Sequence, residues 1–162
     1  MGIICSNKRG MSPAELNTLI QMPSLPYATG VHSGKTILVV DDDVVILRLV
    51  RESLTALLQC EVDTTPNPEY AFEMMLKKSY DLVIFDFSMP GIDGAILYSL
   101  ITKVYEIIPP AGRGRTPPLI LMSGNASQKR AQELLREPGV RGLLAKPFSI
   151  EKLVAKVSEL LT

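Results

Sequence analysis

Hydrophobic positions in this chain gather in short unbroken runs that are separated by amphipathic stretches. Four such runs, at 37–40, 82–85, 119–122 and 142–145, are each followed directly by a polar residue. Strands of a parallel sheet give unbroken apolar runs because both faces of the sheet are covered, and crossover helices give the amphipathic stretches. The pattern therefore predicts an α/β fold built on a doubly wound parallel sheet.

From residue 35 onward, the chain contains five repeats of a strand followed by a helix. The second strand is the most polar of the five, which favours a place at the edge of the sheet. Residues 109–118 hold four prolines and two glycines and are predicted to form an extended loop. The strands are expected at Thr36–Val40, Glu61–Thr65, Leu82–Phe85, Leu119–Met122 and Arg141–Ala145, and the helices at 44–58, 68–78, 94–107, 127–136 and 150–161.

Capping signals and apolar spacing add detail to these helices. Asn67-Pro68 starts the second helix, because Asn caps well and proline suits the first helical position. Asp93-Gly94 is interpreted as a turn and the cap of the third helix. The face of the first helix that packs on the sheet is expected to carry Ile46, Leu49, Val50, Leu54 and Leu57.

Polar groups stand where four of the strands end. Asp41 and Asp42 follow the first strand, Asp86 the third, Ser123 the fourth and Lys146 the fifth. In an open parallel sheet, sites form outside the carboxyl ends of the strands. The sequence therefore predicts that these five side chains share one rim of the sheet.

Carboxylates held close together repel one another and need compensation. A divalent cation and the ammonium of Lys146 could supply it, and Mg²⁺ suits a site of one or two carboxylates plus a phosphate. Each group alone has a simpler interpretation: Asp as a helix cap, Lys146 in a surface ion pair, Ser123 in a turn. Their combination at the ends of four strands favours phosphate chemistry.

Four motifs in this order resemble the receiver domain of two-component response regulators. They are Val39-Val40-Asp41-Asp42, the run 86–94, Met122-Ser123-Gly124 and Lys146-Pro147-Phe148. The resemblance covers about residues 35–162. It implies a flavodoxin-like (βα)5 fold with strand order 2-1-3-4-5, and a phosphoryl group taken from phosphohistidine onto Asp86.

The same resemblance implies a metal site at the rim. Asp42 and Asp86 would ligate Mg²⁺ directly, and the backbone carbonyl of Ser88 would be the third protein ligand. Asp41 would act partly through a metal-bound water. The implied cofactor is therefore Mg²⁺, bound by Asp41, Asp42, Asp86 and Ser88.

The other rim residues are implied to bind the phosphoryl group. Lys146 would pair with its oxygens, Ser123 would donate a hydrogen bond to one of them, and Lys146-Pro147 would be a cis peptide. One departure concerns Leu143, which stands where many receivers carry a Tyr or Phe that swings inward on phosphorylation. Ser88 lies at a position that influences the lifetime of the phosphoaspartate, and position 123 is Ser rather than the commoner Thr.

Bulk composition excludes several classes of function. Lys plus Arg and Asp plus Glu number 17 each and Trp is absent, so neither a basic groove nor a stacking platform for nucleic acid is expected. Cys5 and Cys60 lie far apart and His32 is the single histidine, which makes zinc improbable and suits a reducing compartment. No apolar run approaches the roughly 20 residues that span a bilayer.

Residues 1–34 differ from the rest and are expected to form a docking or partly ordered arm. Ser12-Pro13-Ala14-Glu15 has the pattern of a capping box and predicts a short helix at about 13–21. Leu16, Leu19 and Ile20 share one face of that helix. So short a helix is marginal in water unless it packs against something.

The first six residues match the pattern for N-myristoylation, with Gly2 as acceptor and Ser6 at the required position. One myristoyl chain binds membranes only reversibly, and the second signal could be palmitoylation of Cys5 or the basic pair Lys8-Arg9. A chance match is the alternative, because the pattern is short. The expected location is cytoplasmic, with peripheral attachment to the membrane where Gly2 is lipidated.

We therefore expect a stand-alone receiver, since the chain ends at Thr162 directly after the final helix. Its partners would be a histidine kinase or a histidine phosphotransfer protein and a downstream protein. Its chemistry would be limited to phosphorylation and autodephosphorylation of Asp86. Two alternatives stay open: a non-phosphorylated interaction module with the same fold, and a haloacid-dehalogenase-like phosphohydrolase that uses the Asp-x-Asp of Asp41–Asp43.

Overall fold

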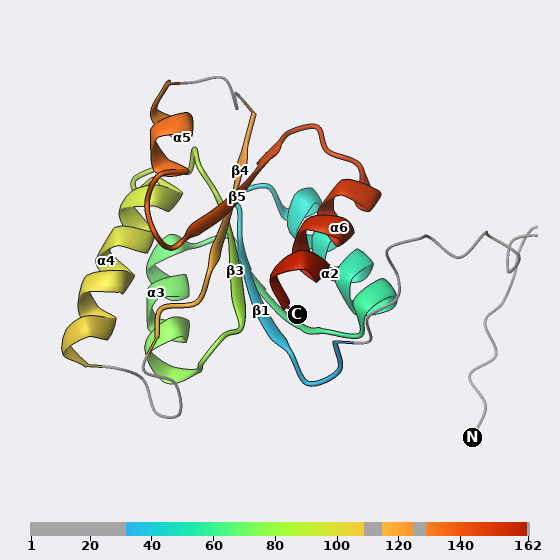
Figure 1. The fold of residues 1–162 in the computed structure, drawn as a ribbon, viewed down its shortest axis with the longest axis horizontal. Coiled ribbons are helices and arrows are strands. Elements are labelled where there is room, and N and C mark those ends of the chain that lie inside the picture. The colour runs from blue at the N-terminus through green and yellow to red at the C-terminus, as the bar shows by residue number, and fades with distance from the viewer. Residues whose placement is uncertain (1–31, 109–114, 125–128, 162) are drawn as a thin grey trace, which may run out of the picture.

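The computed structural model describes residues 32–108, 115–124 and 129–161. Five parallel strands form one sheet in the order β2-β1-β3-β4-β5, which confirms the predicted topology and the edge position of the second strand. Helices α2 and α6 cover one face of the sheet, and α3, α4 and α5 cover the other (Figure 1). The strands are β1 (Thr36–Val40), β2 (Glu61–Thr65), β3 (Leu82–Asp86), β4 (Leu119–Ser123) and β5 (Val140–Ala145), and the helices are α2 (Val44–Leu58), α3 (Pro68–Lys77), α4 (Gly94–Ile107), α5 (Lys129–Leu134) and α6 (Ile150–Leu161).

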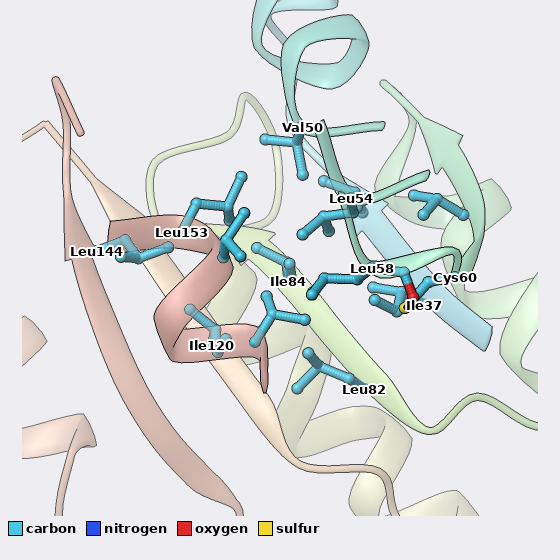
Figure 2. Close-up of a cluster of buried hydrophobic side chains, with 14 of the residues drawn as sticks. Ile37, Val50, Leu54, Leu58, Cys60, Leu82, Ile84, Ile120, Leu144 and Leu153 are labelled. Carbon is cyan, nitrogen blue, oxygen red and sulfur yellow. Dashed lines mark hydrogen bonds between the residues drawn. The ribbon is translucent and has the colours of Figure 1, made fainter. Parts of the chain in front are cut away.

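Side chains of the central strands alternate between two hydrophobic cores. Ile37 and Val39 of β1 point toward α2 and α6, whereas Leu38 and Val40 point toward α3 and α4. Figure 2 shows the first core, in which Leu54 of α2 packs with residues from the strands and from α6. Because both faces are covered, β3 and β4 are buried along their whole length, as their unbroken apolar runs predict.

The predicted inner face of α2 is correct in part. Val50 and Leu54 are fully buried, and Ile46 and Leu57 pack partly buried against the core. The prediction that Leu49 lies on this buried face was wrong, because 37% of its surface is exposed. Apolar residues also occupy the neighbouring helical positions, and the buried stripe runs through those instead. The residues of α2 that the spacing missed are Leu47, Ser53 and Leu58.

The helix starts follow the predicted capping signals. The Asn67 side chain accepts a hydrogen bond from the Tyr70 N–H at the start of α3, and Asp93 accepts one from Ile96 at the start of α4. Helix α5 is described from Lys129 to Leu134, inside the predicted range 127–136. The expected helix at 13–21, the lipidation pattern and residues 109–114 of the predicted loop lie outside the described residues.

One glycine is required by close packing rather than by a turn. A Cβ atom at Gly94, the first residue of α4, would lie 2.2 Å from the backbone carbonyl oxygen of Asp86 and 3.0 Å from the Cβ of Phe85. Glycine therefore lets the start of α4 rest directly against the end of β3. This contact fixes the backbone at one of the predicted rim carboxylates.

We expect Gly94→Ala to lower the free energy of unfolding by about 1–3 kcal/mol, because the added methyl group forces α4 away from β3. Urea denaturation monitored by circular dichroism measures the change. Gly124→Ala is the matched control, since a Cβ there meets no atom of the described residues within 4 Å. Equal stability of the two variants would contradict the packing role of Gly94.

Candidate functional site

The strand ends bring the predicted rim residues together. Asp86 is the last residue of β3 and Ser123 the last of β4, so each of these strands ends one residue later than predicted. Asp41 and Asp42 follow β1 directly, and Lys146 follows β5. Carboxylate oxygens of Asp41, Asp42 and Asp86 all lie within 4.8 Å of one another. The predicted juxtaposition of the three carboxylates is therefore observed.

Lys146 bridges the two buried carboxylates of this cluster. Its Nζ lies 2.5 Å from Oδ2 of Asp41 and 2.8 Å from Oδ1 of Asp86. The side chain of Asp41 is fully buried and that of Asp86 is 5% exposed. Lys146 is thus part of a partly buried ionic network, and the alternative of a simple surface ion pair is wrong.

Backbone groups hold the same carboxylates from the opposite side. The Asp43 N–H donates to Oδ1 of Asp41 at 2.9 Å, and the Ser88 N–H donates to Oδ2 of Asp86 at 3.2 Å. Each carboxylate therefore accepts from the lysine with one oxygen and from a main-chain N–H with the other. On the lysine side, the Lys146 N–H donates to the Ser123 carbonyl at 2.8 Å, and Lys146-Pro147 is a cis peptide.

The pKa values of Asp41 and Lys146 in this cluster are both raised. Burial raises the pKa of Asp41, and the hydrogen bonds from Lys146 and from the Asp43 N–H only partly oppose this. Burial alone would lower the pKa of Lys146, but its hydrogen bonds to Asp41 and Asp86 outweigh burial and raise it. Because both pKa values are raised, Asp41 and Lys146 bind their protons more tightly here than the same groups would in water.

A divalent cation fits the composition of this site. Three carboxylates and one ammonium leave a formal charge of −2 when all four groups are ionised. Asp42 is exposed, so the cluster opens to solvent on one side. Carboxylate oxygens at an accessible rim are the ligands that Mg²⁺ and Ca²⁺ take in proteins.

The remaining predicted residues lie around the cluster. Ser123 is buried, with 1% of its surface exposed, at the end of β4 and beside Ala145 of β5. Ser88 is exposed, two residues after Asp86. Leu143 of β5 is half-buried and packs against the core under α3 and α4. The predicted roles of the Ser88 carbonyl and the Ser123 hydroxyl stay predictions.

Asp43 has a purely structural place. It is the N-cap of α2, and its Oδ1 accepts a hydrogen bond from the Val45 N–H at 2.8 Å. The Asp-x-Asp pair that a phosphohydrolase would need is therefore divided between the cluster and a helix cap. The sequence placed Gly94 in a turn and helix cap but missed its close packing against Asp86, because that packing depends on a contact between elements.

The response regulator receiver domain model matches residues 37–158, from the second residue of β1 to Ser158 in α6. The chain belongs to the response regulator receiver domain family. The haloacid-dehalogenase alternative is therefore wrong. Within the described part of this receiver, no helix is both long enough and apolar enough to cross a membrane.

Two curated proteins of different kinds are similar to this receiver. It is 31% identical over 122 residues to the probable chemotaxis protein CheY of Rhizobium etli, across 75% of this chain and 88% of that protein. It is 31% identical over 158 residues to the transcription factor SKN7 of Candida albicans, across 98% of this chain and 25% of that protein. This receiver thus spans only about a quarter of the transcription factor that it matches.

A solved structure shows the same fold. The receiver domain of a Francisella response regulator superposes with a TM-score of 0.66 at 25% identity, covering 79% of this chain and 97% of that one. The shared fold places the acidic rim at the carboxyl ends of equivalent parallel strands. Receivers in general bind Mg²⁺ at an acidic pocket of this kind, and they interact with histidine kinases or phosphotransfer proteins.

We expect Lys146→Met to lower the free energy of unfolding at pH 7 by about 1–3 kcal/mol, because it leaves buried carboxylates without their cation. The pKa of Lys146 is raised by folding, so its contribution is fully present at pH 7 and is lost only in alkaline solution. Acid should reduce the difference between variant and wild type, because protonation of Asp41, whose pKa is raised, removes the buried charge.

Urea denaturation at pH 7 and at pH 4 checks this expectation. Lys77→Met is the matched control, since Lys77 pairs with Glu73 on an exposed helix face, and the change there should stay below about 1 kcal/mol. A loss for Lys146→Met that is the same at both pH values would show that packing, not charge, explains it.

Proposed function

We propose that this receiver is a phosphoacceptor that takes a phosphoryl group from phosphohistidine of a histidine kinase or histidine phosphotransfer protein onto Asp86. The observation that supports this most directly is the Lys146 ammonium lying between Asp41 and Asp86 at the open rim. This arrangement provides a carboxylate nucleophile with a fixed positive charge beside it. Phosphoryl transfer depends mostly on such positioning and charge neutralisation.

In the proposed step, a carboxylate oxygen of Asp86 attacks the phosphorus atom and forms a P–O bond. The P–N bond to the histidine breaks, and its electron pair stays on the imidazole nitrogen, which then takes a proton from solvent. The Ser88 N–H and Lys146 hold the Asp86 carboxylate in place for this attack. Water attacking the phosphorus of the acyl phosphate returns Asp86 and inorganic phosphate.

We assign a divalent metal site to Asp41, Asp42, Asp86 and the backbone carbonyl of Ser88. Bound Mg²⁺ would neutralise negative charge on the transferring phosphoryl oxygens. Lys146 then changes partners: it now neutralises Asp41 and Asp86, and it would pair with a phosphoryl oxygen once Asp86 is modified. Ser123, at the end of the neighbouring strand, would donate a hydrogen bond to another phosphoryl oxygen.

We expect phosphoramidate with Mg²⁺ to phosphorylate the protein and Asp86→Asn to abolish the product, because the amide is not a nucleophile. Phos-tag electrophoresis resolves the two forms, and the retarded band should also disappear when EDTA replaces Mg²⁺. A retarded band that persists in Asp86→Asn would place the modification elsewhere.

Two neighbouring residues provide a matched test of the metal site. Asp42→Asn should raise the Mg²⁺ concentration for half-maximal phosphorylation by about tenfold or more, because it removes a ligand. Asp43→Asn makes the same change of charge but keeps the helix cap, since Asn caps as well as Asp. Equal effects of the two variants would attribute the metal dependence to general electrostatics.

A second candidate function is a non-phosphorylated interaction module with the receiver fold. Leu143 favours it, because this half-buried aliphatic side chain takes the place of the aromatic that the family resemblance implies. The complete set of Asp42, Asp86 and Lys146 opposes it. Absence of phosphorylation with several donors, in a protein that is folded, would favour this module.

We further propose a cytoplasmic location with attachment to a membrane surface through lipid on Gly2 and Cys5. The support for this is the sequence pattern of the first nine residues alone. Coexpression with an N-myristoyltransferase should add the mass of one myristoyl chain to the N-terminal peptide, and Gly2→Ala should abolish the addition. An unmodified wild-type peptide would show that the match is a chance one.

A further inference from the structure

A groove of about 750 Å³ runs along the edge of the domain between α2 and β2. It arises because β2 is the edge strand and pairs with β1 alone among the described strands. Thr64 of β2 is paired with Val39, so it belongs to the face of the sheet that α2 covers. The groove extends from Ala56 near the end of α2 to Val44 at its start.

The lining of this groove combines an apolar floor with basic side chains. Leu47, 6% exposed, forms part of the floor, and Val44 is 65% exposed at the end of the groove beside the acidic rim. Arg48, Arg51 and Glu52 line it as well. Arg48 is paired with Glu52, with its Nε 2.8 Å from Oε1 of Glu52, so the lining carries a net positive charge at Arg51. A docked segment with apolar residues on one face and a negative charge would complement this surface.

The described chain enters the domain beside this groove. His32 is buried, with 9% of its surface exposed, and its backbone N–H donates to the carbonyl of Leu58 at 3.0 Å. Leu58 is the last residue of α2, and Ala56 in the groove lies two residues before it. The 31 residues that precede His32 are therefore joined to the domain at one end of the groove.

The sequence of this arm has the chemistry that the groove requires. Its predicted helix at about 13–21 carries Leu16, Leu19 and Ile20 on one face, and such a short helix needs a surface to pack against. Glu15, one position before this apolar face begins, is the single acidic residue among residues 1–31. The occupant thus offers an apolar stripe with one negative charge.

We infer that the segment 13–21 of the N-terminal arm docks in the groove between α2 and β2 of its own domain, with Leu16, Leu19 and Ile20 on the apolar floor and Glu15 near Arg51. The linker between this segment and the domain is long enough for the docking. The ten residues 22–31 can extend over about 33 Å, and α2 with 15 residues is about 22 Å long. The inference does not depend on phosphorylation of Asp86.

Nuclear magnetic resonance of the full chain tests this docking. Leu16→Asp places a charge on the apolar face of the segment and should shift the amide signals of Thr55, Ala56 and Thr64, which line the groove. Thr18→Asp is the matched control, because residue 18 lies on the opposite face of a helix and should leave those signals in place. No shift for Leu16→Asp, or equal shifts for both variants, would overturn the proposal.

A substitution on the groove gives the reciprocal measurement. Ala56 is exposed on α2, and Arg is a good helix former, so Ala56→Arg should leave the domain folded while it obstructs the groove. We expect the amide signals of residues 13–21 to shift in this variant, and to do so equally at low and high protein concentration. Unchanged arm signals would overturn the docking, and shifts that depend on concentration would overturn it in favour of exchange between two copies.

Discussion

Burial of negative charge at the carboxyl ends of the strands is the constraint on which the rest of this structure depends. Asp41 and Asp86 are almost without solvent contact, and an isolated buried carboxylate is strongly disfavoured. The compensating ammonium of Lys146 is 105 residues distant from Asp41 in the sequence. The charge network therefore forms only when β5 has joined the sheet, so the site is a property of the complete domain.

The two faces of the sheet and its rim have separate roles. Both faces are sealed by apolar side chains, which hold β1, β3 and β4 in fixed register. At the rim, the same strands end in polar groups, and a lysine, two backbone N–H groups and an open side all meet at the carboxylates. The close contact of Gly94 with the Asp86 carbonyl connects α4 directly to the end of β3 that carries the Asp86 carboxylate. An apolar scaffold on both faces thus supports a polar site at one edge of the sheet.

Sequence reasoning succeeded where one local pattern decides the outcome. Unbroken apolar runs identified the central strands, and a polar residue after each run located Asp86 and Lys146 at the rim, because parallel strands end together. It failed where two local solutions were equivalent: in α2, Leu49 and Leu47 are both apolar, and only packing against the sheet decides which is buried. It also missed the close packing at Gly94, since a glycine at a helix start is equally suited to a turn. Glycine is required at position 94 because the end of β3 lies against it, and no local sequence pattern reveals that contact.

The hydrogen bond from His32 to Leu58 has a consequence for orientation. It fixes the entry of the chain at the amino ends of the strands, whereas Asp86 lies at their carboxyl ends. A strand of five residues separates these levels by about 17 Å. The chain therefore enters the described domain on the side opposite the acidic rim. A partner that approaches the acidic rim therefore does not meet the point at which the chain enters the domain.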